Sequence, residues 1–421
     1  MEEMKSFMLN YSKRIVGPAM LEYTKWILFE AQRKNIKRLY FLARDGYLLS
    51  KIAKRIIEKN GLDIDCRYLY CSRASLRLPS YHAISEEETF DILLLGGYYV
   101  TPKSLLQRAC FSDDELQRLY DELEISFPDN CLNEDELNAL RQKIKKNDFY
   151  KQAVIEKSKL AFPATIDYLK SEGLFDSDHV AIVDSGWTGS MQRSLRQLLE
   201  AAGHTPKITG FYFGMYVSPK DEKDGEYNTY YFSKNKGTKR KIYFNNNLFE
   251  CMLSAPHPMT LGYEYDENGH VRPYFANNHS EKMLPLIEAQ IEGALEYTEG
   301  YLEGVEKEYN EKASLKRTYK ILKRAMVYPT KEEADIFSSF TFCDDITEKY
   351  QISLADENMR KSLKEYLILN RVFKKLLGKK QSGKSQLFWP YGVIAHCPKI
   401  VRPWYRLNVL FGDYLKFMLK K

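Results

Sequence analysis

Short apolar runs of strand length alternate with longer amphipathic segments at the start of the chain. Residues 18–34 carry apolar side chains at helical spacing, and the apolar run 38–43 stops at Arg44-Asp45-Gly46. A second amphipathic segment extends from Tyr47 to about Lys59, and a strand-like run follows over residues 66–71. Strand, tight turn, helix and strand in this order predict a βαβ unit of a parallel sheet.

Charged helical segments interrupt this pattern, with predicted helix starts at Ser112 and Asn133. The sheet pattern then resumes with the apolar run 180–183, which ends at Asp184, and a long amphipathic helix is predicted from Met191 to about Ala202. The chain therefore resembles two sheet-forming halves with a helical insertion between them.

The rest of the chain predicts one further strand over 208–217, short antiparallel strands within the aromatic segment 226–275, and helices over 281–377. We expect an α/β fold: a mostly parallel sheet with strand-loop-helix units, a large helical insertion and a helical C-terminal region. The predicted division is an α/β catalytic core at 1–84 and 170–275, the insertion at 85–169 and the C-terminal region at 276–421.

The composition predicts a folded protein of a reducing compartment. Hydrophobic residues make up 44% of the 421 positions, and the net charge of +6 is too small to indicate a nucleic-acid partner. The seven cysteines are scattered without a Cys-x-x-Cys pair, which is typical of free thiols. With no signal peptide and no run of about 18 apolar residues, we expect a soluble, cytoplasmic protein.

Two motifs match the residue patterns of well-known sites, but the elements predicted around them do not match. Residues 378–385 fit the phosphate-binding loop G-x-x-x-x-G-K-[ST], yet a charged helical pattern precedes them where a buried strand is needed. We interpret them as a mobile basic loop. Residues 176–180 fit the Asp-x-Asp signature of haloacid-dehalogenase phosphatases, but the predicted strand follows the motif instead of preceding it. We interpret this motif as a helix-to-strand loop.

The two strand-loop-helix units carry the candidate chemistry. In a parallel sheet, the loops after the strands that end at Ala43 and Asp184 should open onto one crevice. Thr188-Gly189-Ser190, at a helix start, offers N–H groups and hydroxyls to a phosphate. Asp184 could bind sugar hydroxyls or Mg²⁺, and Arg44 with Arg73 could clamp a second phosphate. The alternative is that these turns only cap helices.

The second loop resembles the phosphoribosyl-diphosphate loop of phosphoribosyltransferases, with Val183 in place of the first of two acids. A wider resemblance is to the glycan phosphoribosyltransferase module of bacterial ribofuranosyltransferases, proteins often described as haloacid-dehalogenase-like. The motifs that carry it are Phe41-Leu42-Ala43-Arg44-Asp45-Gly46, Tyr70-Cys71-Ser72-Arg73, Val183 to Ser190, Glu250 with Ser254-Ala255-Pro256, and Trp389-Pro390-Tyr391-Gly392.

This resemblance implies transfer of 5-phosphoribose from phosphoribosyl diphosphate to a glycan hydroxyl during O-antigen or capsule assembly. It implies catalytic roles for Asp45, Asp184 and Glu250, with Asp45 as the leading general base, Glu250 as its alternative, and Asp184 as a ligand of ribose or Mg²⁺. The residues expected to bind substrate are Arg44, Gly46, Arg73, Ser185, Gly186, Trp187, Thr188, Gly189, Ser190 and Gln192.

The implied partners are a glycan acceptor, which lipid-linked intermediates would supply, and a separate phosphatase, because the chain has no convincing phosphatase nucleophile. The aromatic and basic tail, residues 401–421, predicts either packing against the fold or contact with the inner face of a membrane. Two other functions remain open at this point: a haloacid-dehalogenase-like phosphohydrolase and a non-catalytic polysaccharide assembly factor.

Overall fold

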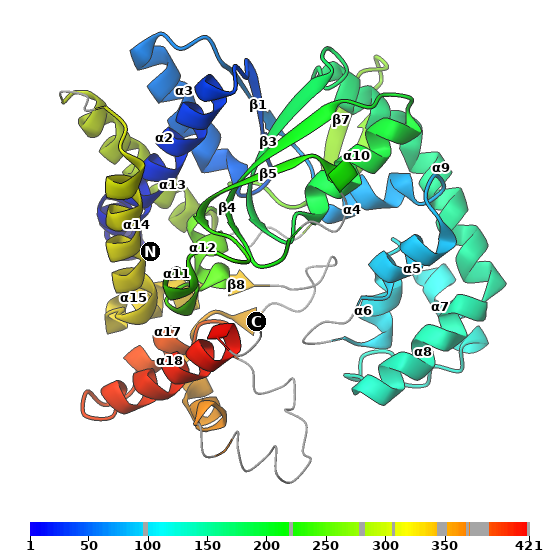
Figure 1. Cartoon of the computed structure of the whole chain (residues 1–421). Coiled ribbons are helices and arrows are strands. Elements are labelled where there is room, and N and C mark those ends of the chain that lie inside the picture. The colour runs from blue at the N-terminus through cyan, green and yellow to red at the C-terminus, as the bar shows by residue number, and fades with distance from the viewer. Residues whose placement is uncertain are drawn as a thin grey trace.

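The computed structural model has a mixed α/β fold that is 59% helical and is built on a five-stranded parallel sheet (Figure 1). This agrees with the predicted fold class. The residues that the structure describes are 1–95, 100–218, 222–277, 283–304, 308–342, 352–367, 370 and 387–418. The motif at 378–385 lies outside them.

The parallel sheet has the strand order β2-β1-β3-β4-β5. Its strands are β1 (Arg38–Leu42), β2 (Asp65–Leu69), β3 (His179–Trp187), β4 (Lys207–Met215) and β5 (Glu226–Phe232). The four strands predicted up to residue 217 are confirmed. The prediction of antiparallel strands over 226–275 is wrong for β5, which pairs parallel to β4, and right for the hairpin β6 (Thr260–Tyr265) and β7 (Val271–Phe275).

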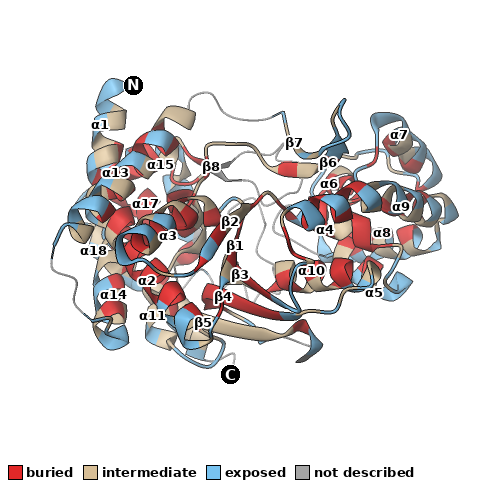
Figure 2. Cartoon of the chain, turned by 90° about the horizontal axis from the view of Figure 1, so that it is seen from above, coloured by how far each residue is buried: buried red, intermediate tan, exposed pale blue. Residues whose placement is uncertain are grey.

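Helices cover both faces of this sheet because alternate strand residues point to opposite sides. Phe41 and Val183 belong to the core on one face, and Leu42 and Ile182 to the core on the other. The strands are mostly buried between these layers (Figure 2). The first face is covered by α1 (Glu2–Tyr11), a π-helical segment (Ser12–Val16), α2 (Gly17–Arg33) and α3 (Gly46–Asn60), and the second by α10 (Ser190–Ala201) and the end of α9 (Asp148–Ser171).

The helical insertion has a hydrophobic core of its own, made of residues between Tyr81 and Val154. It follows α4 (Arg73–Arg77) and a 3-10 turn at Leu78–Ser80, and it projects from one side of the sheet (Figure 1). Ser112 and Asn133 cap its helices as predicted. Its helices are α5 (Glu86–Leu93), α6 (Pro102–Gln107), α7 (Asp113–Glu122), α8 (Glu134–Lys146) and the start of α9.

The C-terminal helices share the core of α1 to α3 and do not form a separate one. The pair β8 (Thr341–Phe342) and β9 (Ile352–Ser353), which we did not predict, interrupts them. The remaining elements are 3-10 turns at Glu222–Asp224 and Glu357–Tyr366, and α11 (Thr238–Ile242), α12 (Asn246–Met252), α13 (Leu284–Leu302), α14 (Glu311–Val327), α15 (Lys331–Ser338), α17 (Pro390–Ala395) and α18 (Arg402–Met418). No helix in the described part of the chain has the length and apolar character needed to cross a membrane.

The strand order fixes where a ligand can bind. From β1 the chain goes outward to β2 and then returns to β3 on the other side of β1, so the direction of winding switches between β1 and β3. The helix after β1, α3, packs on one face, and the helix after β3, α10, packs on the other. A crevice therefore opens between the two loops at the carboxyl ends of these strands, as in other doubly wound sheets.

Candidate active site

Arg44 and Asp45 form the loop that follows β1. Asp45 directly precedes α3, and Arg44 is exposed. Gly46 begins α3 and sits so close to β1 that a Cβ atom there would lie 2.7 Å from the carbonyl carbon of Phe41. Gly46 thus allows the helix to pack against the strand, and it does not line the cavity described below.

The end of β3 brings Asp184, Ser185, Gly186 and Trp187 to the same edge of the sheet, since Phe41 pairs with Val183. Tyr23, from α2, donates a hydrogen bond of 2.9 Å to the backbone oxygen of Asp184 and thereby holds the strand end. Gly186 has a φ of +115°, and a Cβ atom at this position would clash with the backbone of Gly214 on β4. Only glycine fits this position.

Thr188, Gly189 and Ser190 form the turn into α10. Gly189 has a φ of +70° and caps the helix without a side-chain hydrogen bond. The first N–H groups of a helix have no partner within the helix, and the helix dipole makes this end positive. Since Thr188 and Ser190 both line the cavity, this end of α10 is suited to an anion.

Gln192 does not contribute to this site, in contrast to the sequence-based prediction. Its side chain is fully buried and turned away from the cavity. The amide nitrogen donates to the backbone oxygens of Asp224 and Glu226, and the amide oxygen accepts a hydrogen bond of 2.8 Å from Tyr212. Gln192 therefore ties α10 to the sheet and to the turn before β5.

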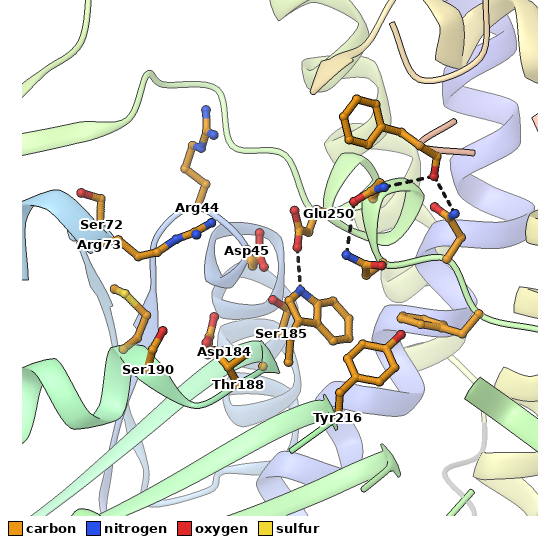
Figure 3. A pocket seen from close by; sticks show the side chains of 18 of the residues that line it. Arg44, Asp45, Ser72, Arg73, Asp184, Ser185, Thr188, Ser190, Tyr216 and Glu250 are labelled. Atoms are coloured by element: carbon orange, nitrogen blue, oxygen red, sulfur yellow. Dashed lines mark hydrogen bonds between the residues drawn. The ribbon is translucent and has the colours of Figure 1, made fainter. Parts of the chain in front are cut away.

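Arg73 comes from a third strand end, after β2. Ser72 caps α4 in a capping box with Ser75, and its hydroxyl also donates to the backbone oxygen of Thr260 at 2.6 Å. This fixes the start of α4, from which the exposed side chain of Arg73 extends toward Asp45 (Figure 3).

These loops line one cavity with a volume of about 480 Å³, which is in the range of small-molecule sites (Figure 3). Arg44 and Thr188, 144 positions apart, share it. The predicted residues that line it are Arg44, Asp45, Arg73, Asp184, Ser185, Gly186, Trp187, Thr188, Ser190 and Glu250. Gly46, Gly189 and Gln192 are not among its lining residues.

Three carboxyl groups in this cavity influence one another. Burial raises the pKa of Asp45, whereas a hydrogen bond from Ser185 and the charges of Arg44 and Arg73 lower it. Burial and the charge of Asp45 raise the pKa of Asp184 to about 7. The same two causes raise the pKa of Glu250 to about 8. Ionising all three carboxyl groups together is therefore unfavourable, and a cationic ligand or a developing positive charge would favour their ionised forms.

Trp187 connects the loop after β3 to Glu250 on α12. Its φ of +73° is uncommon for a residue with a side chain. This backbone turn aims the indole at α12, where Nε1 donates a hydrogen bond of 2.6 Å to Oε1 of Glu250. The ring also packs against Phe244 and Phe249. Trp187 is thus both a core side chain and part of the cavity wall.

The opposite wall comes from segments that the sequence did not indicate, apart from Pro390 and Tyr391. The amides of Asn245 and Asn247 both donate to the backbone oxygen of Phe388, at 2.8 and 3.0 Å. Trp389, whose indole donates to the backbone oxygen of Met326, anchors the same segment. The further lining residues of this wall include Tyr216, Phe244, Asn246, Tyr366, Leu387, Val409, Asp413, Lys416 and Phe417. The run Asn245-Asn246-Asn247 is a further signal for this wall in the sequence.

Other motifs lie away from this cavity. Asp176 pairs with Arg38 at the opposite edge of the sheet, in a loop before β3, as predicted. The ring nitrogens of His257 contact the hydroxyl of Tyr68 and the backbone oxygen of Pro258, which agrees with a structural role. Residues 254–256 do not line the cavity.

The described residues contain no cluster of three His, Cys, Asp or Glu side chains that could hold a metal ion by themselves. Mg²⁺, however, is commonly held by one or two carboxylates together with substrate phosphates. Asp184 fits this arrangement. The negative charge of Asp45 raises the pKa of Asp184, and a bound cation would offset this repulsion between the two carboxylates.

We compared the sequence with known proteins. No protein-family model matches it, and no curated protein matches it significantly.

Proposed function

We propose that this protein is a glycosyltransferase that moves 5-phosphoribose from phosphoribosyl diphosphate to a hydroxyl group of a glycan, in the assembly of a surface polysaccharide. The observation that carries the proposal is the shared cavity: the loops after β1, β2 and β3 meet there with an anion-binding helix start, two arginines and three carboxyl groups. The resemblance to the glycan phosphoribosyltransferase module supports the same assignment.

The two ends of the donor would bind to different loops. Thr188 and Ser190, at the start of α10, would hold the 5-phosphate through hydroxyl and backbone N–H groups. Arg44 and Arg73 would hold the diphosphate, since guanidinium groups pair well with phosphate oxygens. Asp184 lies between these loops and would bind the ribose hydroxyls. The distance between the two anion sites is then set by the sheet itself.

The transfer forms a bond between the acceptor oxygen and C1 of ribose and breaks the bond between C1 and the diphosphate. Diphosphate leaves with the bonding electrons, and the acceptor hydroxyl gives its proton to a carboxylate. Positive charge develops on the ribose ring, and the carboxylates of Asp45 and Asp184 would stabilise it. Mg²⁺, if bound by Asp184 and the diphosphate, would neutralise charge on the leaving group.

We assign the general base to Glu250 and not to Asp45, the leading candidate from the sequence. Glu250 lies on α12, the helix whose first residues form the wall opposite the arginines. Asp45 lies beside Arg44 and Arg73, where the diphosphate would bind. The acceptor sugar would then occupy the wall of Asn246, Tyr216 and Phe417, because amides and aromatic rings match the hydroxyls and apolar faces of sugars.

The direct test is incubation with phosphoribosyl diphosphate, Mg²⁺ and a panel of synthetic glycans. We expect diphosphate release that depends on the acceptor, together with a glycan that gains one phosphoribosyl group by mass spectrometry. Removal of its 5-phosphate would need a separate phosphatase. Release of orthophosphate from simple phosphate esters would instead support a phosphohydrolase. The absence of both activities across a broad panel would favour the assembly factor.

A further inference from the structure

Helix α18 has two very different faces. On one face Val409, Asp413 and Phe417 line the cavity, and Asn408 and Val409 are buried. On the other face the helix exposes a row of large apolar side chains, which Ile400 extends from the turn two positions before the helix: Ile400, Trp404, Leu407, Phe411, Tyr414 and Met418. We call this row the α18 stripe. Packing against the fold, one of the two alternatives that the sequence predicts for the tail, is thus observed for one face, and contact with a membrane stays a prediction for the other.

The α18 stripe is continuous. From Trp404 to Met418 its residues follow one another at intervals of three and four, which places them on one side of α18. They account for six of the fifteen large apolar side chains that the described part of the chain exposes, and Ile400 and Leu407 are exposed to 88% and 65%. Single exposed apolar residues are ordinary on soluble proteins, but a contiguous row of this kind marks a binding surface.

The surroundings of the α18 stripe are strongly basic. Residues 399–418 contain four cations and one acid, and of these Asp413 and Lys416 both line the cavity. Helix α11 packs against α18, and residues 234–241, which include α11, contain five cations and no acid. Lys234, Lys236 and Lys239 are exposed. Figure 1 shows α11 and α18 next to each other on the side of the molecule away from the insertion.

We propose that the α18 stripe binds the surface of a membrane that contains anionic lipids. Large apolar and aromatic side chains on one side of a helix, such as Trp404, Leu407 and Phe411, are typical of helices that lie in the plane of the interface. The rings of Trp404 and Tyr414 suit the headgroup level, where one part of the side chain is apolar and the other contacts water. The exposed lysines near α11 complement the negative charge of the lipids.

Pairing of two copies through the same stripe is less favourable on electrostatic grounds. It would bring two segments that each carry an excess of cations together, whereas anionic headgroups would neutralise them. Membrane binding also has a geometric consequence, because α18 forms part of the cavity wall. The cavity would lie one helix diameter from the lipid surface, next to acceptors that are carried on lipids.

Sedimentation of the full-length protein with vesicles tests this surface. We expect binding to vesicles of phosphatidylcholine mixed with phosphatidylglycerol, and much weaker binding to phosphatidylcholine alone. The double variant Leu407→Ser, Phe411→Ser should bind the mixed vesicles about tenfold more weakly or worse, since each side chain loses the transfer energy of a large apolar group. Lys236→Glu with Lys239→Glu should weaken binding to the mixed vesicles only.

Leu160→Ser is the matched control, because Leu160 is 83% exposed on α9, in the part of the chain that leads from the insertion to the sheet. It should bind like the wild type. Unchanged vesicle binding by the Leu407 and Phe411 variant, with circular dichroism like that of the wild type, would overturn the proposal. So would a wild-type dimer, measured by light scattering, that binds no vesicles and becomes a monomer in this variant.

The vesicle assay does not depend on the proposed enzyme activity. If the transferase assignment is right, the Leu407 and Phe411 variant should still transfer phosphoribose to a water-soluble acceptor, since neither residue lines the cavity. Failure of membrane binding and failure of the transferase assignment therefore give different results.

Discussion

The indole of Trp187 and the carboxyl group of Glu250, 63 positions apart, are joined by a hydrogen bond of 2.6 Å at the centre of the cavity. The bond links the end of β3 to α12, and so it connects the donor side of the proposed site to the acceptor side. It also holds the half-buried carboxyl group of Glu250 near Asp45, and the negative charge of Glu250 is unfavourable there.

The first prediction concerns stability and pH. Burial and the charge of Asp45 raise the pKa of Glu250 from 4.5 to about 8 in the folded protein. The folded state therefore binds this proton more tightly than the unfolded state, and Glu250 costs no stability below pH 4.5 and most above pH 8. We expect the free energy of unfolding of Glu250→Gln, relative to the wild type, to increase between these limits in urea titrations. A difference that stays constant across this pH range would contradict the prediction.

The second prediction concerns the donor. Arg44→Ala, Arg73→Ala and Asp184→Asn should each lower acceptor-dependent diphosphate release by about a hundredfold or more, because each removes a charge that acts on the transition state. Arg118→Ala, on the surface of the insertion, is the control and should retain full activity. Thermal unfolding should show that the three variants remain folded. Full activity in Arg44→Ala and Asp184→Asn together would reject the site assignment.

The third prediction separates structure from binding at Gln192. Gln192→Ala leaves the hydroxyl of Tyr212 and two backbone oxygens without their partner, so we expect a loss of about 2 kcal/mol in the free energy of unfolding. The KM for phosphoribosyl diphosphate should stay within about twofold of the wild-type value, because the side chain does not reach the cavity. Gln117→Ala, on exposed α7, controls for stability. A large rise in KM without loss of stability would restore the original substrate-binding role.

The fourth prediction tests the acceptor wall. Phe417 lines the cavity, and its ring lies parallel to that of Tyr216, with centroids 6.0 Å apart. Phe417→Ala should raise the KM for the glycan and leave the KM for phosphoribosyl diphosphate unchanged, since the ring lies on the wall opposite the arginines. Phe127→Ala, a highly exposed site outside the cavity, is the control. Equal effects on both substrates would show that Phe417 acts on the cavity as a whole.

The sheet and its loops could be predicted because their signals are local. An apolar run followed by Arg44-Asp45-Gly46, and another followed by Asp184 and a glycine-rich turn, specify strand ends directly, and parallel strands bring such ends to one edge. The direction of β5 could not be predicted, because a strand rich in Tyr and Phe has the same pattern in a parallel and in an antiparallel sheet.

The wrong prediction that Gln192 binds substrate and the failure to predict the cavity wall opposite the arginines have different physical causes. Ser190 and Gln192 are two positions apart in α10. Because each helical residue rotates the direction of its side chain, Gln192 points away from the cavity and toward the sheet. Asp413 and Phe417 reach the cavity only because Trp389 and the amides of Asn245 and Asn247 hold the C-terminal segment across the sheet. Contacts between residues more than 140 positions apart leave no periodic trace in the sequence.

The anchoring of Phe388 on Asn245 and Asn247 has a practical consequence for dissecting the protein. A fragment that stopped after β7 would keep every loop residue assigned to the donor and would lose nine of the thirty residues that line the cavity. It would also uncover the part of the core of α1 to α3 that the C-terminal helices share. A fragment trimmed to the sheet would thus expose apolar surface and carry an incomplete cavity. Its failure to react would say nothing about the loops themselves.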